Sequence, residues 1–258
     1  MNFKIIFGVF FLIGFAVLLQ SCSSTEEVII QGAGETFRTG MAYLRDGAYD
    51  KAKNEFDIVV KQYPASAYAD SAQYYLAETY YDREEFLTAA FEYQNLIRNY
   101  PTSRLAPQAR FQVAKCYEQQ SPRVELDQDN TSKAIDAFQS FIDYYPTSPL
   151  VSEAEKEIMN LRNKLAEKDY AIAQQYQILG YYKAATVYYD EILDQYHDSG
   201  IADKASIEKV KVLMMRKKDN DAKAALEKFY IMFPNSALKT QADDLARQLN
   251  MSGQVGVQ

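Results

Sequence analysis

The stretch Tyr63-Pro-Ala-Ser-Ala-Tyr-Ala-Asp-Ser-Ala72 decides the fold, because nearly the same ten residues occur five times along the chain. The copies are YPASAYADSA from Tyr63, YPTSRLAPQA from Tyr100, YPTSPLVSEA from Tyr145, YHDSGIADKA from Tyr196 and FPNSALKTQA from Phe233. Proline follows the aromatic residue in four copies, and proline is tolerated at a helix end but not in a helix interior. The pattern therefore predicts that a helix ends at each aromatic residue and that the serine three positions later caps the next helix.

A second set of positions recurs upstream of each aromatic residue. Eleven residues before it stand Ala52, Ala89, Ala134, Ala185 and Ala222, and seven before it stand Phe56, Tyr93, Phe138, Tyr189 and Leu226. Positions four apart share one helix face, so the small residue admits a close neighbour and the large one fills the next gap. The pattern resembles the tetratricopeptide repeat, and it predicts an all-α solenoid of about five helix pairs plus a C-terminal capping helix over residues 35–250.

The composition argues against several classes of function. A net charge of -7 in 258 residues and an isoelectric point near 5.0 oppose a nucleic-acid-binding surface, which requires clustered lysine and arginine. The ten glycines and one histidine form no phosphate-binding loop, catalytic triad or metal-ligand set. We therefore expect a binding protein without cofactor or metal, and not an enzyme.

The N-terminus has the features of a signal sequence. Lys4 precedes an apolar run from Ile5 to Leu19, and Leu19-Gln20-Ser21-Cys22 resembles the lipobox of bacterial lipoproteins. We expect residues 1–21 to be removed, Cys22 to carry the lipid, residues 22–34 to be a tether without helical structure, and residues 251–258 to be a disordered tail. The alternative is an ordinary secretory signal in which Cys22 has no role.

Two other reactive residue types occur singly and are interpreted as structural. Cys116 lies in an apolar segment beside Ala114 and Tyr117, which is typical of a small buried residue. His197 stands where other copies have proline, at an expected helix end. Neither residue has the companions that a zinc site or a Cys-His dyad requires.

The array is interrupted in two places. The third repeat carries eight extra residues within the region 118–130, which contains Pro122 and several acids and is typical of an exposed loop. Its role is open between a functional loop and a tolerated one. The fourteen extra residues before the fourth repeat contain no proline or glycine, so we expect one long helix over residues 151–179.

One candidate site is a peptide groove on the first helices of the first three repeats. Their outward positions, taken from the repeat register, are Phe37, Met41, Leu44, Tyr74, Tyr81 and Phe111. An exposed apolar and aromatic groove usually marks a binding site. The alternative is that neighbouring helices or the tether cover these side chains.

A second candidate site is a basic patch in the fifth repeat. It consists of Lys209, Lys211, Arg216, Lys217 and Lys218, arranged around an apolar centre from Val212 to Met215. On an acidic protein such a patch suits an acidic protein partner. The alternative is an ordinary solvated helix face.

The layout as a whole resembles the BamD family of lipoproteins, which belong to the machinery that inserts β-barrel proteins into the outer membrane of Gram-negative bacteria. The resemblance rests on the lipobox, five repeats with YPxS junctions, the interrupted third repeat, the long helix and the short tail. It implies a palmitate-bearing protein anchored in the outer membrane on the periplasmic side. It also implies that the C-terminal repeats bind the barrel-forming subunit BamA and that the N-terminal repeats capture barrel precursors. The alternative function is a periplasmic tetratricopeptide lipoprotein that scaffolds cell-envelope synthesis or division.

Overall fold

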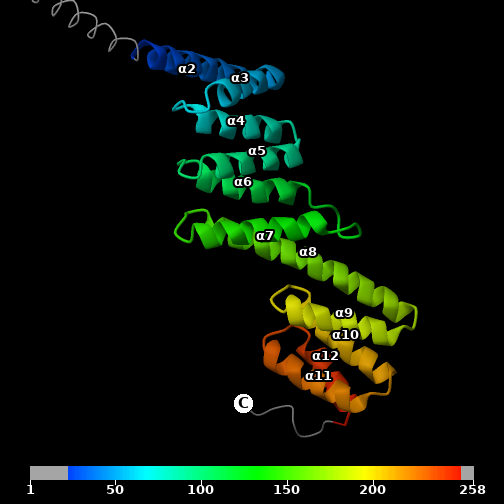
Figure 1. Cartoon of the computed structure of the whole chain (residues 1–258). Coiled ribbons are helices and arrows are strands. Elements are labelled where there is room, and N and C mark those ends of the chain that lie inside the picture. The colour runs from blue at the N-terminus through cyan, green and yellow to red at the C-terminus, as the bar shows by residue number, and fades with distance from the viewer. Residues whose placement is uncertain (1–22, 251–258) are drawn as a thin grey trace, which may run out of the picture. The chain divides into compact units, whose positions relative to one another are not determined.

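The computed structural model describes the backbone of residues 23–250 and the side chains from residue 32 onward, and its regular elements in that part are all helices. The described part contains eleven helices, α2 to α12 (Figure 1). The fold class expected from the sequence, an all-α tetratricopeptide array, is confirmed. The expected signal peptide, Cys22 and the tail from residue 251 lie outside the described residues. The chain divides into two units, one ending at Gln120 and one beginning at Ser121, and each is considered separately.

The N-terminal unit is a stack of five helices in which each packs against the next (Figure 1). The helices are α2 (Ser23–Arg45), α3 (Tyr49–Gln62), α4 (Ala69–Asp82), α5 (Phe86–Asn99) and α6 (Ala106–Gln119). At its start, Phe56 and Val59 of α3 form a core with Ala72 and Leu76 of α4. Gly40 of α2 is part of this packing, because a Cβ at that position would lie 2.8 Å from Cε1 of Phe56.

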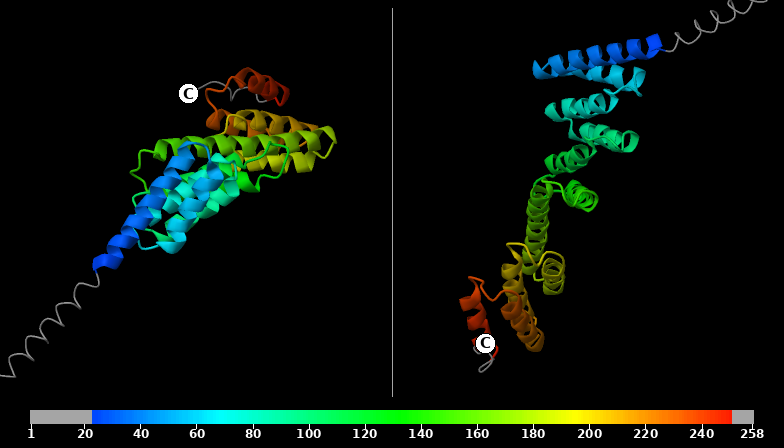
Figure 2. Two further views of the ribbon diagram at one scale, coloured as in Figure 1. Left: turned by 90° about the horizontal axis from the view of Figure 1, so that it is seen from above. Right: turned by 90° about the vertical axis from the view of Figure 1, so that its left-hand side faces the viewer.

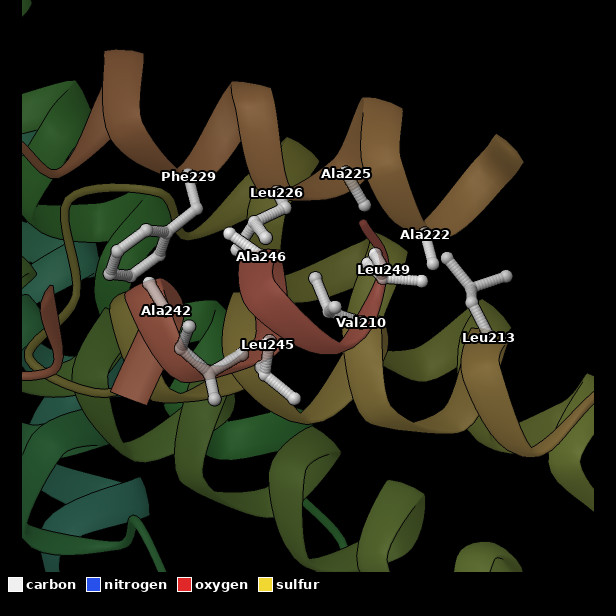
Figure 3. Close-up of a cluster of buried hydrophobic side chains, with 11 residues drawn as sticks. Val210, Leu213, Ala222, Ala225, Leu226, Phe229, Ala242, Leu245, Ala246 and Leu249 are labelled. Atoms are coloured by element: carbon white, nitrogen blue, oxygen red, sulfur yellow. The ribbon is translucent and has the colours of Figure 1, made fainter. Parts of the chain in front are cut away.

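The C-terminal unit contains six helices, which the two views of Figure 2 show from other sides. They are α7 (Asp129–Tyr144), α8 (Val151–Ile178), α9 (Tyr182–Gln195), α10 (Ala202–Met215), α11 (Asp219–Met232) and α12 (Lys239–Gln248). The long helix expected over residues 151–179 is therefore confirmed as α8. Leu245 and Leu249 at the end of the chain pack with Val210 of α10 and Leu226 of α11 (Figure 3), so α12 closes the apolar end of this unit.

The recurring alanines and large apolar residues are the core positions of both units. All ten of these side chains are completely inaccessible to solvent, and they are Ala52, Ala89, Ala134, Ala185, Ala222, Phe56, Tyr93, Phe138, Tyr189 and Leu226. A small residue lets the neighbouring helix approach closely, and the large residue one turn later fills the space beside it. The repeat spacing in the sequence therefore predicted the packed face of the second helix in each pair.

At the junctions between helix pairs, one helix ends and the next begins near the positions that the sequence predicted. The side-chain hydrogen bond at the start of the next helix differs from the expected one. The second helices end one residue before Tyr63, Tyr100, Tyr145, Tyr196 and Phe233. The junction serines were expected to be N-caps, and that expectation was wrong. At four of the five junctions the serine Oγ accepts the N–H two residues later, as in Leu238 N to Ser236 Oγ at 3.0 Å, and the helix starts one residue further on.

Two of these serines also connect consecutive repeats within a unit. Ser103 Oγ donates to Oδ2 of Asp70 at 2.6 Å, and Ser236 Oγ donates to Oδ2 of Asp203 at the same distance. Each aspartate stands 33 residues before its serine, in the first turn of the preceding first helix. The hydrogen bond thus fixes one junction to the next within each unit.

The turns inside the helix pairs share one backbone geometry. In four of the five turns, all except the α6–α7 connection that holds the insertion, one residue is left-handed; these residues are Gly47, Glu84, Gly180 and Lys217, with φ of 71°, 61°, 78° and 57°. The N–H of the left-handed residue donates to the carbonyl three residues before it. The N–H of the next residue donates to the carbonyl five residues before that next residue. This pattern satisfies the last carbonyls of the first helix and reverses the chain.

The start of the first repeat differs from the expectation. Helix α2 begins at Ser23, so the idea that residues 23–34 lack helical structure was wrong. Gly32 and Gly34 weakened the helical pattern in the sequence, but they are small for a packing reason. A Cβ on Gly34 would lie only 2.9 Å from Cε2 of Tyr68, so glycine lets α2 lie close against the first junction.

Candidate functional site

The proposed aromatic groove of the N-terminal unit is not open in the structure. Tyr74 is 8% exposed and Phe111 4% exposed. The ring of Tyr74 meets that of Tyr93 edge to face, with centroids 5.5 Å apart. The expectation that these rings form an exposed face was therefore wrong, because both side chains are buried and Tyr74 packs against Tyr93 of α5.

The remaining groove candidates are partly buried against the same core. Phe37, Met41 and Leu44 pack onto the cluster that contains Phe56. Tyr81 is half-buried and lies edge to face against Phe86, with ring centroids 5.1 Å apart. The six residues thus pack largely against neighbouring helices and do not form one open groove. Phe37 also lines a cavity of about 800 Å³ together with Tyr75 and Tyr100.

A carboxylate organises the polar side of this aromatic layer. Oε1 of Glu78 accepts hydrogen bonds from the Tyr93 hydroxyl at 2.5 Å and from Nε2 of Gln112 at 3.1 Å. Burial, followed by the nearby Glu78 charge, raises the pKa values of the Tyr74 and Tyr93 hydroxyls far above the usual range. These phenols are therefore neutral hydrogen-bond donors at any physiological pH, which is a structural role.

The basic patch divides into two parts. Lys209 forms an ion pair with Asp190 of α9, and its side chain is 17% exposed. Lys211 pairs with Glu208 on the same helix at 2.7 Å. The positive charges of these two lysines are balanced within the unit, so they contribute little attraction for an external acid.

The other three basic residues lie at the turn between α10 and α11. Lys217 and Lys218 are exposed, and Lys217 is the left-handed residue of the turn. Arg216 is half-buried, and its Nη1 donates to Oγ1 of Thr186 on α9 at 3.2 Å. Among the side chains of residues 32–250, none of these three has a carboxylate partner. The patch that can attract an acid therefore consists of Arg216, Lys217 and Lys218.

The structure brings exposed apolar side chains to the same place, and the sequence analysis named only Met215 among them. Five large side chains near the α8–α9 and α10–α11 turns are more than half exposed, namely Ile178, Leu179, Tyr181, Val187 and Met215. Beside them lies a cavity of about 760 Å³ that Tyr176, Tyr181, Val187 and Arg216 help to line. We call this region the turn pocket. The run Ile178-Leu179-Gly180-Tyr181 was its signal, because apolar residues are unusual in a turn.

The insertion in the third repeat is an ordered loop. Gln128, 7% exposed, donates from Nε2 to the carbonyls of Arg123 at 2.8 Å and Leu126 at 3.0 Å. Lys168 of α8 donates to the Leu126 carbonyl at 2.6 Å. The side-chain amide of Gln128 and the ammonium group of Lys168 on α8 thus both hold the loop backbone in place. These contacts do not assign the loop a function.

The isolated cysteine and histidine have the surroundings of structural residues. Cys116 is completely buried, and its burial, with Glu78 nearby, raises the pKa of the thiol to about 12, so it is unreactive at neutral pH. His197 is exposed at the junction after α9. The described side chains, those of residues 32–250, form no cluster of three or more potential metal ligands. In the same part of the chain, no helix has the length and apolar character needed to cross a bilayer.

The chain is similar to several known proteins. A family model described as outer membrane lipoprotein, YfiO, matches residues 31–223. The outer membrane protein assembly factor BamD of Vibrio cholerae serotype O1 is 23% identical over 199 residues, which cover 73% of this chain and 83% of that protein.

Solved structures of tetratricopeptide proteins also resemble the chain. The TPR2AB domain of yeast Sti1, solved in its pHSP90 complex, is 14% identical, and the alignment covers 84% of this chain and 98% of that one with a TM-score of 0.41. A tetratricopeptide protein of Parabacteroides merdae is 12% identical, with coverage of 87% and 94% and a TM-score of 0.39.

Proposed function

This chain belongs to the YfiO family of outer membrane lipoproteins, and on that premise we propose that it is an assembly factor for outer membrane β-barrel proteins. In this function it binds a BamA-like barrel-forming subunit and captures barrel precursors before they insert. The family match over residues 31–223 carries the proposal, because it covers well over half of the chain and includes most of the repeats. The similarity to BamD of Vibrio cholerae points to the same function.

The proposed anchor is a lipid on Cys22. The lipobox Leu19-Gln20-Ser21-Cys22 at the end of an apolar run supports it, together with the description of the family as lipoproteins. A single acyl chain binds a membrane only marginally, whereas two or more hold a protein stably at about 0.8 kcal/mol per buried CH2. Acylation of Cys22 would keep the repeats at the periplasmic face of the outer membrane.

The proposed mechanism is binding without catalysis. A tetratricopeptide array presents helix faces and turns to partners. Here the turn pocket and its neighbours Lys217 and Lys218 combine exposed apolar side chains with cations that have no carboxylate partner among the side chains of residues 32–250. Such a surface complements a partner that carries apolar residues beside acids. We therefore place the contact with the BamA-like subunit in the C-terminal unit.

Recovery of partners from native membranes tests the proposed function. The full chain, tagged at its C-terminus, would be extracted from its own cells with mild detergent, and the recovered proteins identified. The proposal expects the barrel-forming subunit in stoichiometric amounts. Recovery of envelope-synthesis or division proteins in its place would support the alternative scaffold function and contradict this one.

A variant that lacks the proposed lipid provides the control. Cys22→Ala should yield a soluble or uncleaved chain, because the acyl chains have no other attachment point in the lipobox. Metabolic labelling with a fatty acid measures this directly. Equal label in the wild type and in Cys22→Ala would contradict the anchor while leaving the partner test intact.

A further inference from the structure

A polar cavity lies in the N-terminal unit, lined by residues of the second helices α3 and α5 and of the first helix α4. Its volume is about 380 Å³. Small-molecule sites in proteins have volumes of roughly 300–1,000 Å³, so the cavity has the size of a site for a compact ligand. Amide, carboxylate, ammonium and phenol groups line it, in contrast to the apolar wall of the turn pocket. We call it the α4 cavity.

A buried amide fixes a carboxylate in the wall of the α4 cavity. Gln73 is 2% exposed, and its Nε2 donates to the backbone carbonyl of Glu92 at 3.1 Å and to Oε2 of Glu92 at 2.8 Å. Nδ2 of Asn95 donates to the same Oε2 at 2.9 Å. Because both N–H groups of the Gln73 amide are used, the orientation of the amide is fixed and its Oε1 is left as an acceptor.

Several polar groups of this wall have hydrogen-bonding capacity that the protein does not use. Among the described residues, no hydrogen-bond partner is found for Oε1 of Gln73, Oε1 of Glu92, the Tyr80 hydroxyl or the Asn99 side-chain amide. Burial, followed by the nearby Glu92 carboxylate, raises the pKa of the Tyr80 hydroxyl, so this group is a neutral donor. The wall therefore offers both acceptors and donors to a ligand.

The C-terminal unit shows that the repeat does not need this polar wall for packing. In the repeat register, Ser206 of α10 is equivalent to Gln73. Likewise, Ala225 of α11 is equivalent to Glu92. Ser206 and Ala225 are both buried, at 3% and 7% exposure. A serine and an alanine thus suffice at these positions, whereas an amide and a carboxylate cost free energy of desolvation. The polar pair is therefore not a requirement of the solenoid geometry.

The charges around the cavity balance each other. Lys61 forms an ion pair with Asp57 at 2.5 Å, and Lys53 and Glu92 supply one further charge of each sign. A wall without net charge does not favour a phosphate or an amine over a neutral ligand. Leu76, which is 4% exposed, adds an apolar patch to the same wall.

This combination fits a compact ring that carries several hydroxyl groups. We propose that the α4 cavity binds a neutral mono- or disaccharide, with its hydroxyls on Gln73, Glu92 and Tyr80 and a C–H face against Leu76. Each sugar hydroxyl both donates and accepts, so it matches a wall that offers both kinds of group. The amide and carboxylate are already held in place, so they lose little conformational freedom on binding. The site goes beyond the proposed assembly function and does not depend on it.

Saturation-transfer difference NMR on the full protein tests the inference. The protein would be solubilised in a detergent without a sugar headgroup, because a glycoside detergent would compete for the cavity. The probes are cellobiose, N,N′-diacetylchitobiose and the zwitterionic dipeptide alanyl-alanine, each titrated to about 10 mM to reach weak affinities. The two disaccharides differ in their acetamido groups, and the dipeptide represents a different class of ligand.

Three variants remove single features of the wall. Tyr80→Phe removes one hydroxyl, Asn99→Ala removes one exposed amide, and Glu92→Gln keeps the shape of the side chain without its charge. Met232→Ala is the matched control, because Met232 of α11 occupies the position of Asn99 in the repeat register and is 42% exposed. Melting followed by circular dichroism separates loss of the site from loss of the fold.

The inference predicts that at least one disaccharide binds the wild type and that the dipeptide does not. Tyr80→Phe and Asn99→Ala should each weaken binding about fivefold, and Glu92→Gln about tenfold, because hydrogen bonds to a charged acceptor are the stronger ones. Met232→Ala should bind like the wild type. A preference between the two disaccharides shows whether the acetamido groups take part, and either preference supports the inference.

Three other outcomes would overturn it. Saturation transfer to the dipeptide alone would assign the cavity to a zwitterion. Equal affinities of the wild type, Tyr80→Phe, Asn99→Ala and Glu92→Gln would place the saccharide contact elsewhere. Absence of transfer to every probe would leave the polar wall with a structural role only. None of these outcomes bears on the recovery of the barrel-forming subunit from membranes.

Discussion

The turns inside the helix pairs of the two units have the same backbone and opposite surface chemistry. In the N-terminal unit the α4–α5 turn is charged and self-contained, since Arg83 forms ion pairs with Asp50 and Glu85. In the C-terminal unit the equivalent turns carry exposed Tyr181 and Met215, and Arg216 has no acid partner among the side chains of residues 32–250. The repeat geometry therefore fixes where a turn lies and leaves its side chains free for function.

This difference in surface chemistry distinguishes turns that only stabilise the fold from turns that can bind a partner. Charged turns that satisfy their own ion pairs need no partner, whereas apolar side chains and an unbalanced guanidinium gain free energy when a ligand covers them. Conversely, Tyr74 and Phe111 of the N-terminal unit, which were expected to bind a peptide, are buried. In this protein, buried aromatic residues hold the repeats together, and exposed ones at the turns are available for recognition.

The largest expected effect is a loss of stability when a core side chain is shortened, and it tests whether the same repeat position is buried in both units. Phe56 of α3 and Leu226 of α11 occupy the same repeat position, and both are fully buried. Phe56→Ala should lower the free energy of unfolding by about 3–5 kcal/mol and Leu226→Ala by about 2–5 kcal/mol, because each leaves a cavity. Urea denaturation followed by circular dichroism measures both.

A matched surface variant controls that experiment. Phe91 lies on α5 and is 55% exposed, so Phe91→Ala should change stability by less than about 0.5 kcal/mol. If Phe91→Ala cost as much as Phe56→Ala, the assignment of core and surface positions would be wrong.

The next effect concerns binding at the turns. The double change Lys217→Glu and Lys218→Glu should weaken the contact with an acidic partner by about tenfold, because it replaces attraction by repulsion at exposed positions. Stability should hardly change, since neither lysine side chain has a partner among the side chains of residues 32–250. Recovery of the barrel-forming subunit in pull-downs at low and moderate salt is the measurement.

The equivalent turn of the N-terminal unit provides the comparison. Reversing exposed Asp82 and Glu84 to lysine alters the charge by the same amount in the opposite unit. Recovery of the subunit should be unaffected. Equal losses for both double variants would mean that the C-terminal turns have no special role.

The smallest effect tests the shared backbone of the turns. Gly47 and Gly180 are left-handed, and a Cβ at either position would meet no atom within 4 Å. Gly47→Ala and Gly180→Ala should therefore each cost about 1 kcal/mol through backbone strain alone. The reverse changes Glu84→Gly and Lys217→Gly should stabilise slightly, by about 0.5 kcal/mol, because they relieve the same strain at a cost in chain entropy. Thermal unfolding that moved in the same direction for all four variants would contradict a common turn geometry.

The sequence predicted the helix ends and packed faces that recur in every repeat. It missed the burial and ion pairing of side chains that depend on neighbouring helices. The spacing of alanines such as Ala89 and of aromatics such as Tyr100 predicted the packed faces and the helix ends, because each copy reports the same local geometry. Exposure was misjudged at Tyr74, since the outward face of one first helix is covered by side chains from the next, and no periodicity within one helix reports that.

Two other misses have local physical causes. Residues 22–34 were expected to lack helical structure, whereas α2 runs through residues 23–34 and Gly34 permits it to lie against the ring of Tyr68. The basic patch was read as one feature because its residues are close in sequence. Which lysine is neutralised depends on residues of another helix, such as Asp190 opposite Lys209, and that pairing appears only in the folded unit.

Site-specific photo-crosslinking in living cells tests the central claim most directly. A photoreactive amino acid would replace Tyr181 in the C-terminal unit or, separately, Glu84 at the equivalent turn of the N-terminal unit. The account predicts adducts with the barrel-forming subunit at position 181 and none above background at position 84. Equal adducts at both positions, or subunit adducts at position 84 alone, would contradict it.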